Sequence, residues 1–268
     1  MKHLPSRIVT TVLLLAYAVP LLYLVLTSLK NNQDVVAHSA SLIFVPSLQG
    51  YVSAFQQGIL GAGLSTILIA GMTTVVCLVI GLPTAYGLAR SRSILIPIGL
   101  SILIILQMIP QTATLIPLYQ VLGSWGMLGS YLGLIVADAA MLLPFTIILL
   151  RPFFASVPLE LEEAAAMDGA TKLGTFARIV LPVVRNGVMT VGTLLFIMTG
   201  GEFIYAVSFL SNPQQYPLSA TVAQQISQYG VDWPALMAIA VLASIPTLIV
   251  FAVGQRTLVR GLSLGAVK

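Results

Sequence analysis

Long stretches of apolar, uncharged residues recur along the chain, and short polar segments separate them. A helix that crosses the hydrocarbon core of a bilayer needs about 20 such residues. The uncharged block from 93 to 137 is too long for one helix, and Pro117 and the turn-forming residues 123–126 divide it. Backbone groups must pair internally in hydrocarbon, so helices are the expected form of these runs. The predicted membrane helices cover residues 8–29, 62–88, 94–116, 131–150, 187–209 and 234–254.

Composition narrows the class of protein further. Of the 268 residues, 58% are hydrophobic and only 7% are charged, whereas a soluble domain carries about 25% charged residues. This excludes a soluble enzyme, a disordered chain and a nucleic-acid-binding protein. Cys77 is the only cysteine, so neither an intrachain disulfide nor a thiolate metal cluster can form. His3 and His38 lie far apart in the sequence, and we predict no metal site.

The distribution of Lys and Arg predicts the orientation of the helices. If the chain crosses the membrane six times and starts inside, only Lys30 of the 12 basic residues falls in an outer segment. Because basic residues concentrate in cytoplasmic loops, both termini are predicted to be cytoplasmic. We expect the first helix to be retained, since its uncharged run exceeds the core of a signal peptide. The predicted divisions are a cytoplasmic N-terminus at 1–7, a first membrane helix at 8–29, an external loop at 30–61, a five-helix core at 62–254 and a cytoplasmic tail at 255–268.

The polar segment from 151 to 186 predicts two short helices on the cytoplasmic side. Ser156 is a suitable N-cap, Pro158 favours the first turn, and three glutamates follow near the positive end of the helix dipole. Gly169 predicts the end of this helix, because glycine readily adopts the left-handed conformation. Thr171 is a suitable cap for a second helix, which Pro182 ends or kinks. The alanine-rich first helix predicts a narrow face that another surface can approach closely.

A motif with fixed spacing lies in this segment. It reads E-A-A-x3-G-x9-I-x-L-P and begins at Glu163. The pattern resembles the EAA motif of the membrane-spanning subunits of binding-protein-dependent ABC importers. The resemblance implies that a coupling helix within 156–182, between the fourth and fifth spans, contacts an ATPase subunit, with Glu163 facing a basic residue of the partner. The residues that it assigns to this contact are Glu163, Ala164, Ala165, Asp168, Gly169, Ile179, Leu181 and Pro182.

Two further segments are similar to the carbohydrate branch of this family, the maltose- and trehalose-type permeases. They are residues 46–55 in the external loop and residues 260–268, which look like the tail of the second, shorter permease. The resemblance implies a carbohydrate solute, such as a di- or oligosaccharide. Gly50 stands where that branch usually has Asn, and Gly200 and Gly201 stand where Trp-Asn usually precedes an acid. The second departure removes an aromatic and an amide side chain from the expected pathway.

The resemblance implies an all-α permease with six membrane helices in a prokaryotic inner membrane. It also implies the partners: a second homologous permease, two ATPase subunits that bind ATP and Mg²⁺, and an external solute-binding protein that is a lipoprotein or periplasmic. The chain has no G-x-x-x-x-G-K-[ST] sequence, so it has no P-loop with which to hydrolyse ATP. We therefore predict a non-catalytic subunit without a cofactor of its own, in contact with membrane lipid and not with nucleic acid.

Two acidic residues, Asp138 and Glu202, fall within predicted membrane helices. An acid at a helix centre costs roughly 2.5–3.5 kcal/mol on insertion, so such residues normally face the bundle interior or an aqueous cavity. Tyr205 follows Glu202 by three positions on the same predicted helix. We name Glu202, Tyr205 and Asp138 as candidate residues of the substrate pathway, with a structural role as the alternative for the two acids.

Three other functions remain open for a small polytopic chain. An ion-coupled secondary carrier would use Asp138 and Glu202 as ion ligands or proton relays, although no duplication of three spans is evident. An intramembrane enzyme would need a nucleophile with a base or a metal, and no His, Lys or Arg falls clearly within the spans. A purely structural membrane scaffold is the third. Dependence of uptake on an ATPase, with indifference to ionophores, distinguishes an importer from a carrier.

Overall fold

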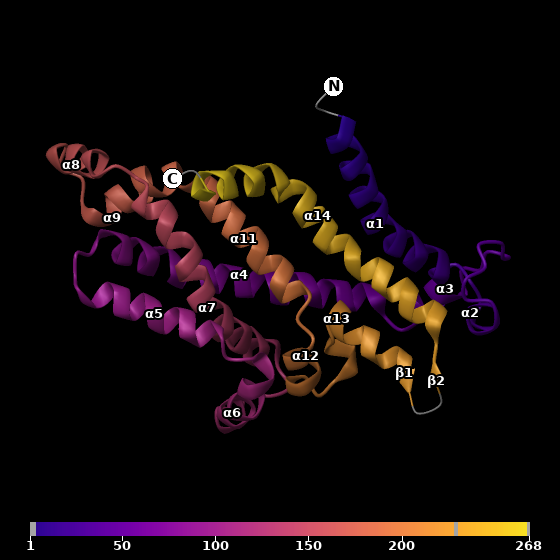
Figure 1. The fold of residues 1–268 in the computed structure, drawn as a ribbon. Coiled ribbons are helices and arrows are strands. Elements are labelled where there is room, and N and C mark those ends of the chain that lie inside the picture. Colours follow the sequence, from indigo (N-terminus) through magenta and orange to yellow (C-terminus); the bar gives the residue numbers. More distant parts are fainter. Residues whose placement is uncertain (1–3, 228–229, 267–268) are drawn as a thin grey trace.

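The computed structural model describes residues 4–227 and 230–266, and the chain is folded there almost entirely into helices (Figure 1). The exception is a short antiparallel hairpin formed by β1 (Ile226–Ser227) and β2 (Gly230–Val231). The all-α fold class predicted from the sequence is confirmed.

Four helices among the described residues are long and apolar enough to cross a membrane. Two bent helix pairs pass the same test together, so the chain has up to six spans, as the sequence predicts. The long helices are α1 (Leu4–Ser28), α4 (Ile59–Arg90), α7 (Tyr131–Ala155) and α14 (Trp233–Ala266). The bent pairs are α5 (Leu95–Gln107) with α6 (Gln111–Ser124), and the segment Lys172–Val183 with α11 (Arg185–Gly200).

The third predicted span is broken at a different proline from the one expected. A single helix was predicted over 94–116, ending near Pro117, but α5 and α6 meet at Pro110 with a bend of 95°. Proline disfavours helical backbone in the residue before it, and Pro110 is extended in this break. Pro117 lies inside α6, where the helix continues. The position of the break therefore depends on the surroundings of each proline as well as on its presence.

The fifth predicted span, 187–209, is also interrupted. α11 ends at Gly200, and a separate helix α12 (Ile204–Phe209) follows after a short break. Gly200 and Gly201 lie at this break, and glycine disfavours the helix because of its low helix propensity. At the chain ends, α1 begins before the predicted residue 8, and α14 continues to Ala266, so most of the predicted tail is helical.

The remaining helices are short and lie in the connections. They are α2 (Asn32–Ala37), α3 (Gln49–Gln56), α8 (Leu159–Met167), α9 (Lys172–Thr175), a π-helical turn (Phe176–Val180), α10 (Leu181–Val183), α13 (Leu218–Thr221) and the 3₁₀ turns Pro213–Gln215 and Val222–Gln225. In Figure 1, α8 and α9 lie at one end of the bundle, whereas α2, α3 and the hairpin lie at the opposite end. The predicted coupling loop and the predicted external loop are thus on opposite sides of the apolar region.

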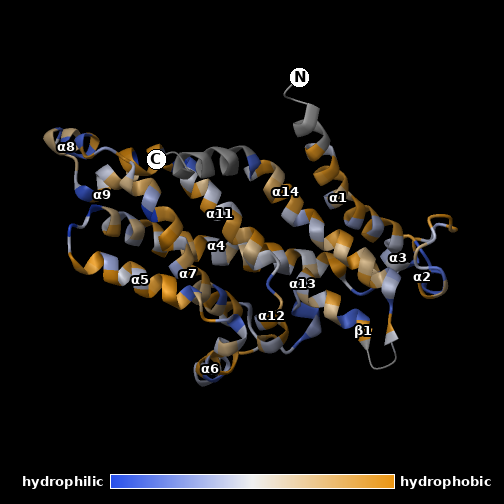
Figure 2. Ribbon diagram, viewed as in Figure 1, coloured by the Kyte–Doolittle hydropathy of each residue, from blue (hydrophilic) through white to orange (hydrophobic). Residues whose placement is uncertain are grey.

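α4 is the central helix of the bundle. It packs against α7 and α11, α11 packs in turn against α14, and α1 lies on α14. Cys77, Leu150, Phe154 and Leu195 are buried together where α4, α7 and α11 meet. α1 and α5 consist largely of apolar residues (Figure 2). Many of these side chains are exposed, as expected for helices whose outer faces meet hydrocarbon instead of water.

Candidate functional site

The helix α8 carries the first part of the EAA-like motif. Ser156, the predicted N-cap, is instead at the end of α7, where its hydroxyl donates to the carbonyl oxygen of Phe153 at 2.8 Å. α8 begins directly after Pro158, and no side chain caps its amino end. The prediction of Ser156 as the cap was wrong, because a serine hydroxyl can bond a carbonyl of the preceding helix equally well.

The end of α8 has the predicted geometry. Gly169 adopts a φ of +81° directly after the C-cap residue Asp168. The amide of Ala170 donates to the carbonyl oxygen of Ala165 at 2.9 Å, which closes a Schellman-type turn. Thr171 then caps α9, and its Oγ1 accepts from the amide of Gly174 at 3.1 Å. The predicted helix–turn–helix is therefore confirmed at the turn between its two helices.

The last part of the motif lies in a wide helical turn. Proline at position 182 has no amide hydrogen, so a regular helix would leave a carbonyl unpaired. The chain forms a π-helical turn just before it, in which the amide of Leu181 donates to the carbonyl of Phe176. Ile179 and Leu181 are half-buried, whereas Pro182 is exposed.

One face of α8 is open to solvent and the other packs on the chain itself. The open face, which we call the α8 stripe, has the helical spacing i, i+3, i+4, i+7 and consists of Glu160, Glu163, Ala164 and Met167. Met167 is 90% exposed, so the stripe presents a large apolar side chain as well as two carboxylates. Ala165 is buried within this chain, so its small size serves internal packing. The sequence motif did not distinguish Ala164 from Ala165.

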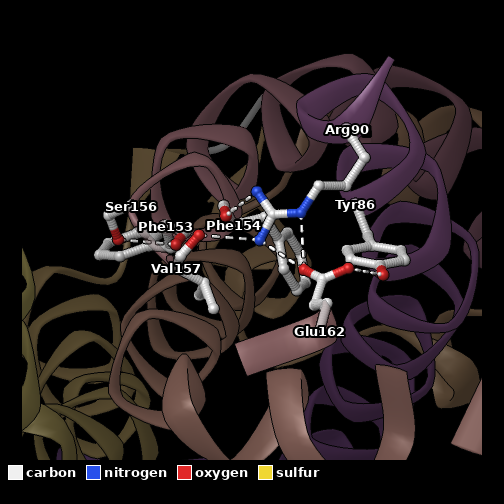
Figure 3. A network of polar contacts seen from close by, with 7 residues as sticks. All are labelled: Tyr86, Arg90, Phe153, Phe154, Ser156, Val157 and Glu162. Atoms are coloured by element: carbon white, nitrogen blue, oxygen red, sulfur yellow. Dashed lines mark hydrogen bonds and ion pairs between the residues drawn. The ribbon is translucent and has the colours of Figure 1, made fainter. Parts of the chain in front are cut away.

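The buried face of α8 is held by Arg90, which is the last residue of α4 (Figure 3). The Arg90 Nε donates to Glu162 Oε1 at 2.6 Å, and the hydroxyl of Tyr86 donates to Glu162 Oε2 at 2.6 Å. The two Nη atoms of Arg90 donate to the carbonyl oxygens of Phe154 at 2.9 Å and Val157 at 3.0 Å. We call this set the Arg90 network.

Sequence reasoning missed the Arg90 network. It counted Arg90 only among the cytoplasmic basic residues and assigned a partner-facing role to Glu163. The arginine and Glu162 are far apart in the sequence, and only the fold brings them together. The available signal was the spacing of Glu162 and Ala165, three positions apart, which places both on one helix face.

The second candidate site lies at the break between α11 and α12. Glu202 was predicted to share a helix with Tyr205, but it precedes α12 and binds its first turn. Glu202 Oε1 accepts from the amide of Tyr205 at 2.7 Å and Oε2 from the amide of Ala206 at 3.0 Å. Gln111, the first residue of α6, donates from Nε2 to Glu202 Oε1 at 2.8 Å. The carboxylate thus joins two broken spans.

Tyr205 is fully buried beneath this carboxylate. Its hydroxyl is hydrogen-bonded to Thr114 Oγ1, and its ring stacks on Phe209 with centroids 5.0 Å apart. Asp138 is buried in α7, and within the described residues its Oδ2 has no hydrogen-bond partner. In this conformation Tyr205 and Asp138 offer a solute no open surface. That these residues line the pathway stays a prediction.

The segment that follows α12 ties this site to α4. The hydroxyl of Ser219 donates to the backbone oxygen of Glu202. The neighbouring residue Leu218 donates its amide to Thr66 Oγ1 of α4 at 2.8 Å. The broken span is therefore linked to α4 through hydrogen bonds between side-chain hydroxyls and backbone groups.

A cavity of about 540 Å³ lies at the opposite end from α8, among α2, α3 and the start of α14. It is lined by polar side chains, including Asn31, Gln49 and Asp232, and by Trp233. The ammonium of Lys30, which also lines it, is buried and donates to the carbonyl oxygen of Ser39 at 2.8 Å. Within residues 4–227 and 230–266, no three His, Cys, Asp or Glu side chains are grouped to hold a metal ion.

Comparison with protein families gives a match over most of the chain. Residues 77–264 match the family described as binding-protein-dependent transport system inner membrane component. The matched region includes the Arg90 network, the α8 stripe and the broken fifth span.

Several relatives are similar over nearly their whole length. The chain is 35% identical to the probable ABC transporter permease protein YurM of Bacillus subtilis, over 95% of this chain and 85% of the relative. It is 30% identical to the sulfoquinovosyl glycerol transport system permease protein SmoH of Agrobacterium fabrum, over 98% and 94%. It is 32% identical to the diacetylchitobiose uptake system permease protein DasC of Streptomyces coelicolor, over 98% and 96%.

The fold is also found among solved structures. A chain in the crystal structure of a bacterial ABC transporter involved in the import of the acidic polysaccharide alginate matches with a TM-score of 0.77 and 22% identity. The match covers 95% of this chain and 97% of the other. A chain of the MetNI methionine ABC transporter matches with a TM-score of 0.59 and 20% identity, over 78% of this chain and 98% of the other.

Proposed function

This chain belongs to the family of binding-protein-dependent transport system inner membrane components, and we propose that it imports a carbohydrate as one of two permeases in an ATP-driven complex. The observation that carries the proposal is the likeness, over nearly the whole chain, to permeases named for sulfoquinovosyl glycerol and diacetylchitobiose. Both names denote solutes with a sugar part. The EAA-like motif on an exposed helix supports the same conclusion.

The α8 stripe is the surface we assign to the ATPase subunit. It combines the carboxylates of Glu160 and Glu163 with the exposed apolar side chain of Met167. Leu173 of α9 is 76% exposed beside the turn at Gly169 and extends the apolar part of the surface. A basic residue of the ATPase would pair with Glu163, and a pocket would receive Met167. In this arrangement α8 faces the cytoplasm, and ATP and Mg²⁺ are bound by the partner.

The opposite end of the bundle would receive the external solute-binding protein. The cavity among α2, α3 and α14 lies there, and its lining is polar. We assign no solute contacts to Glu202 and Tyr205 in the present conformation, because both side chains are engaged within the chain. Opening of the break between α11 and α12 would be needed to expose them. The ion-coupled carrier is not favoured, because the chain belongs to the binding-protein-dependent family and its relative YurM is named as a probable ABC transporter permease.

Site-specific photo-crosslinking in the complete complex tests the docking proposal. A photoreactive amino acid at position 167 should form an adduct with the ATPase subunit, whereas the same residue at Ser53, at the opposite end, should not. Equal crosslinking from both positions, or none from position 167, would overturn the docking site.

Transport in proteoliposomes tests the rest of the proposal. Uptake of a labelled oligosaccharide should require ATP on the ATPase side and the solute-binding protein on the other, and it should be unaffected by an ionophore. Uptake that persists without the ATPase subunit, and that an ionophore abolishes, would establish the ion-coupled carrier instead. A panel of solutes, with an amino acid as the negative control, tests the carbohydrate assignment separately.

A further inference from the structure

We propose that Arg90 is a positioning residue that fixes α8 to the inner end of α4, so that α4, the end of α7 and α8 move together during transport. This rests on the proposed function, because it gives a role to the helix that faces the ATPase. The inference concerns the opposite face of that helix, where Glu162 is bound within the chain.

Arg90 joins the end of α4 to the end of α7 and to α8, which lie 64 to 72 residues further along the chain. Its side chain extends from the end of α4, and it binds a carboxylate on α8, the carbonyl oxygen of Phe154 in the last turn of α7 and that of Val157 in the connection between α7 and α8. Carbonyls at the end of a helix have no partner within the helix. A guanidinium has five N–H donors in a planar fork, which suits three acceptors in different directions, whereas a lysine ammonium is a point charge on a flexible chain.

Aromatic rings partly shield this network from water. The rings of Tyr86, Phe154 and Phe176 surround it, with centroid separations of 5.0 to 6.0 Å. The side chains of Arg90 and Glu162 are only 16% and 17% exposed. A shielded ion pair is stronger than an exposed one, because water screens it less. Phe176 belongs to the wide turn of the motif, so both halves of the loop contact the same cluster.

The alternative attachment of α8 is weak. Without Arg90, the hydrogen bond from Tyr86 to Glu162, the short connection around Val157 and the burial of Ala165 would hold the amino end of α8 to the bundle. A force on the α8 stripe would then be transmitted to α4 mainly through the single hydrogen bond of Tyr86. Arg90 holds α8 firmly against α4, because it forms an ion pair with Glu162, the one glutamate of α8 that faces inward.

Distances between spin labels in the assembled complex test the inference directly. Labels at Ser93, just after α4, and at Leu161, which is exposed on α8 outside the α8 stripe, should give a narrow distribution in the wild type. Arg90→Gln should broaden that distribution, whereas Arg92→Gln, the matched change at an exposed arginine, should not. Tyr86→Phe removes one of the bonds to Glu162 and should broaden it less. If Arg90→Gln leaves the distribution as narrow as the wild type, the inference is wrong.

The amount of solute moved per ATP gives a second, functional test of the role of Arg90. In proteoliposomes, Arg90→Gln should lower the amount of solute moved per ATP, because it removes the ion pair with Glu162 and the bonds to Phe154 and Val157, while the ATPase remains bound. Arg90→Lys should recover part of it. If Arg90→Gln does not assemble, Glu162→Gln, which keeps the size of the side chain, decides. If the assembled variants move as much solute per ATP as the wild type, the inference is wrong. If the wild-type chain binds no ATPase, the proposed function is wrong, and the role of Arg90 is then tested by the spin-label distances alone.

Discussion

A Cβ atom on Gly50 would lie 2.6 Å from the backbone oxygen of Pro234. Gly50 is in α3, and Pro234 is in the first turn of α14, so the two helices approach each other backbone to backbone at this point. Permeases of the carbohydrate branch are expected to carry Asn at the Gly50 position. The structure gives a physical reason for glycine here: no larger side chain fits while α3 and α14 keep this distance.

We expect Gly50→Ala to destabilise the protein. The added methyl group meets rigid backbone, so α3 must shift, at a cost of about 1–3 kcal/mol. The thermal unfolding midpoint of the complex in detergent measures this. Gly61→Ala in α4 is the matched control, because a Cβ there meets nothing within 4 Å. Equal unfolding midpoints for the two variants would contradict a close backbone approach between Gly50 and Pro234.

Substitutions of Gly169 should follow the order of tolerance for a positive φ. A Cβ at Gly169 meets no atom within 4 Å, so the cost comes from the backbone alone. Asn should be tolerated best, Ala should cost about 1–2 kcal/mol, and Val should cost more. Binding of the ATPase subunit to detergent-solubilised complex measures the effect on the loop. A Val variant that binds as well as the Asn variant would contradict the order.

Glu163→Lys should weaken ATPase binding or uncouple ATP hydrolysis from uptake, because it reverses the charge in the α8 stripe. Glu163→Gln should have a smaller effect of the same sign, since it only removes the charge. The two readouts are retention of the ATPase during purification and solute uptake per ATP hydrolysed. Normal coupling in the Lys variant would exclude Glu163 from the docking surface.

Met167→Asp should be as damaging as Glu163→Lys, for a different reason. It places a charge where we expect an apolar pocket of the ATPase, and a desolvated, unpaired carboxylate is costly. Because Met167 is exposed in the isolated chain, the stability of the permease itself should change little. A variant that binds the ATPase normally would show that Met167 lies outside the interface.

Glu202→Gln and Tyr205→Phe distinguish a structural role from a pathway role. Gln at 202 keeps one acceptor and turns an amide NH₂ toward the backbone N–H groups of α12, which should cost about 1–3 kcal/mol of stability. Phe at 205 leaves the Thr114 hydroxyl without this partner. Thermal stability and the apparent affinity for solute should be measured together. A loss of affinity at unchanged stability would point to direct solute contact.

Much of the architecture follows from local patterns in the sequence. The apolar runs predict the spans, and Gly169 and Thr171 predict the turn between α8 and α9, because both effects act over a few residues. The positions at which membrane helices are interrupted could not be predicted from the sequence alone. Pro110 interrupts its span whereas Pro117 does not, since the packing around a proline decides whether the helix can continue.

The roles of adjacent residues depend on tertiary contacts. Glu162 and Glu163 look equivalent in the sequence, yet one is held by Arg90 and the other is exposed. Glu202 was recognised as an unusual acid, but its bonds to Gln111 and to the start of α12 require the break in the helix to be known. Helical spacing shows which residues share a face, but the neighbouring helices decide which face is buried and which is exposed.

α4 forms hydrogen bonds to other segments near both of its ends. Thr66 binds Leu218 near one end, and Arg90 binds Glu162 at the other. About 36 Å of helix separates these two anchor points, at 1.5 Å per residue. A swing of about 3° around one anchor would carry the other through roughly 2 Å, which is the size of the shifts that packed helices make. In the proposed complex, α4 would therefore act as a rigid lever between α8 at one end and, at the other, the segment Leu218–Ser219 that binds Glu202 at the break in the fifth span.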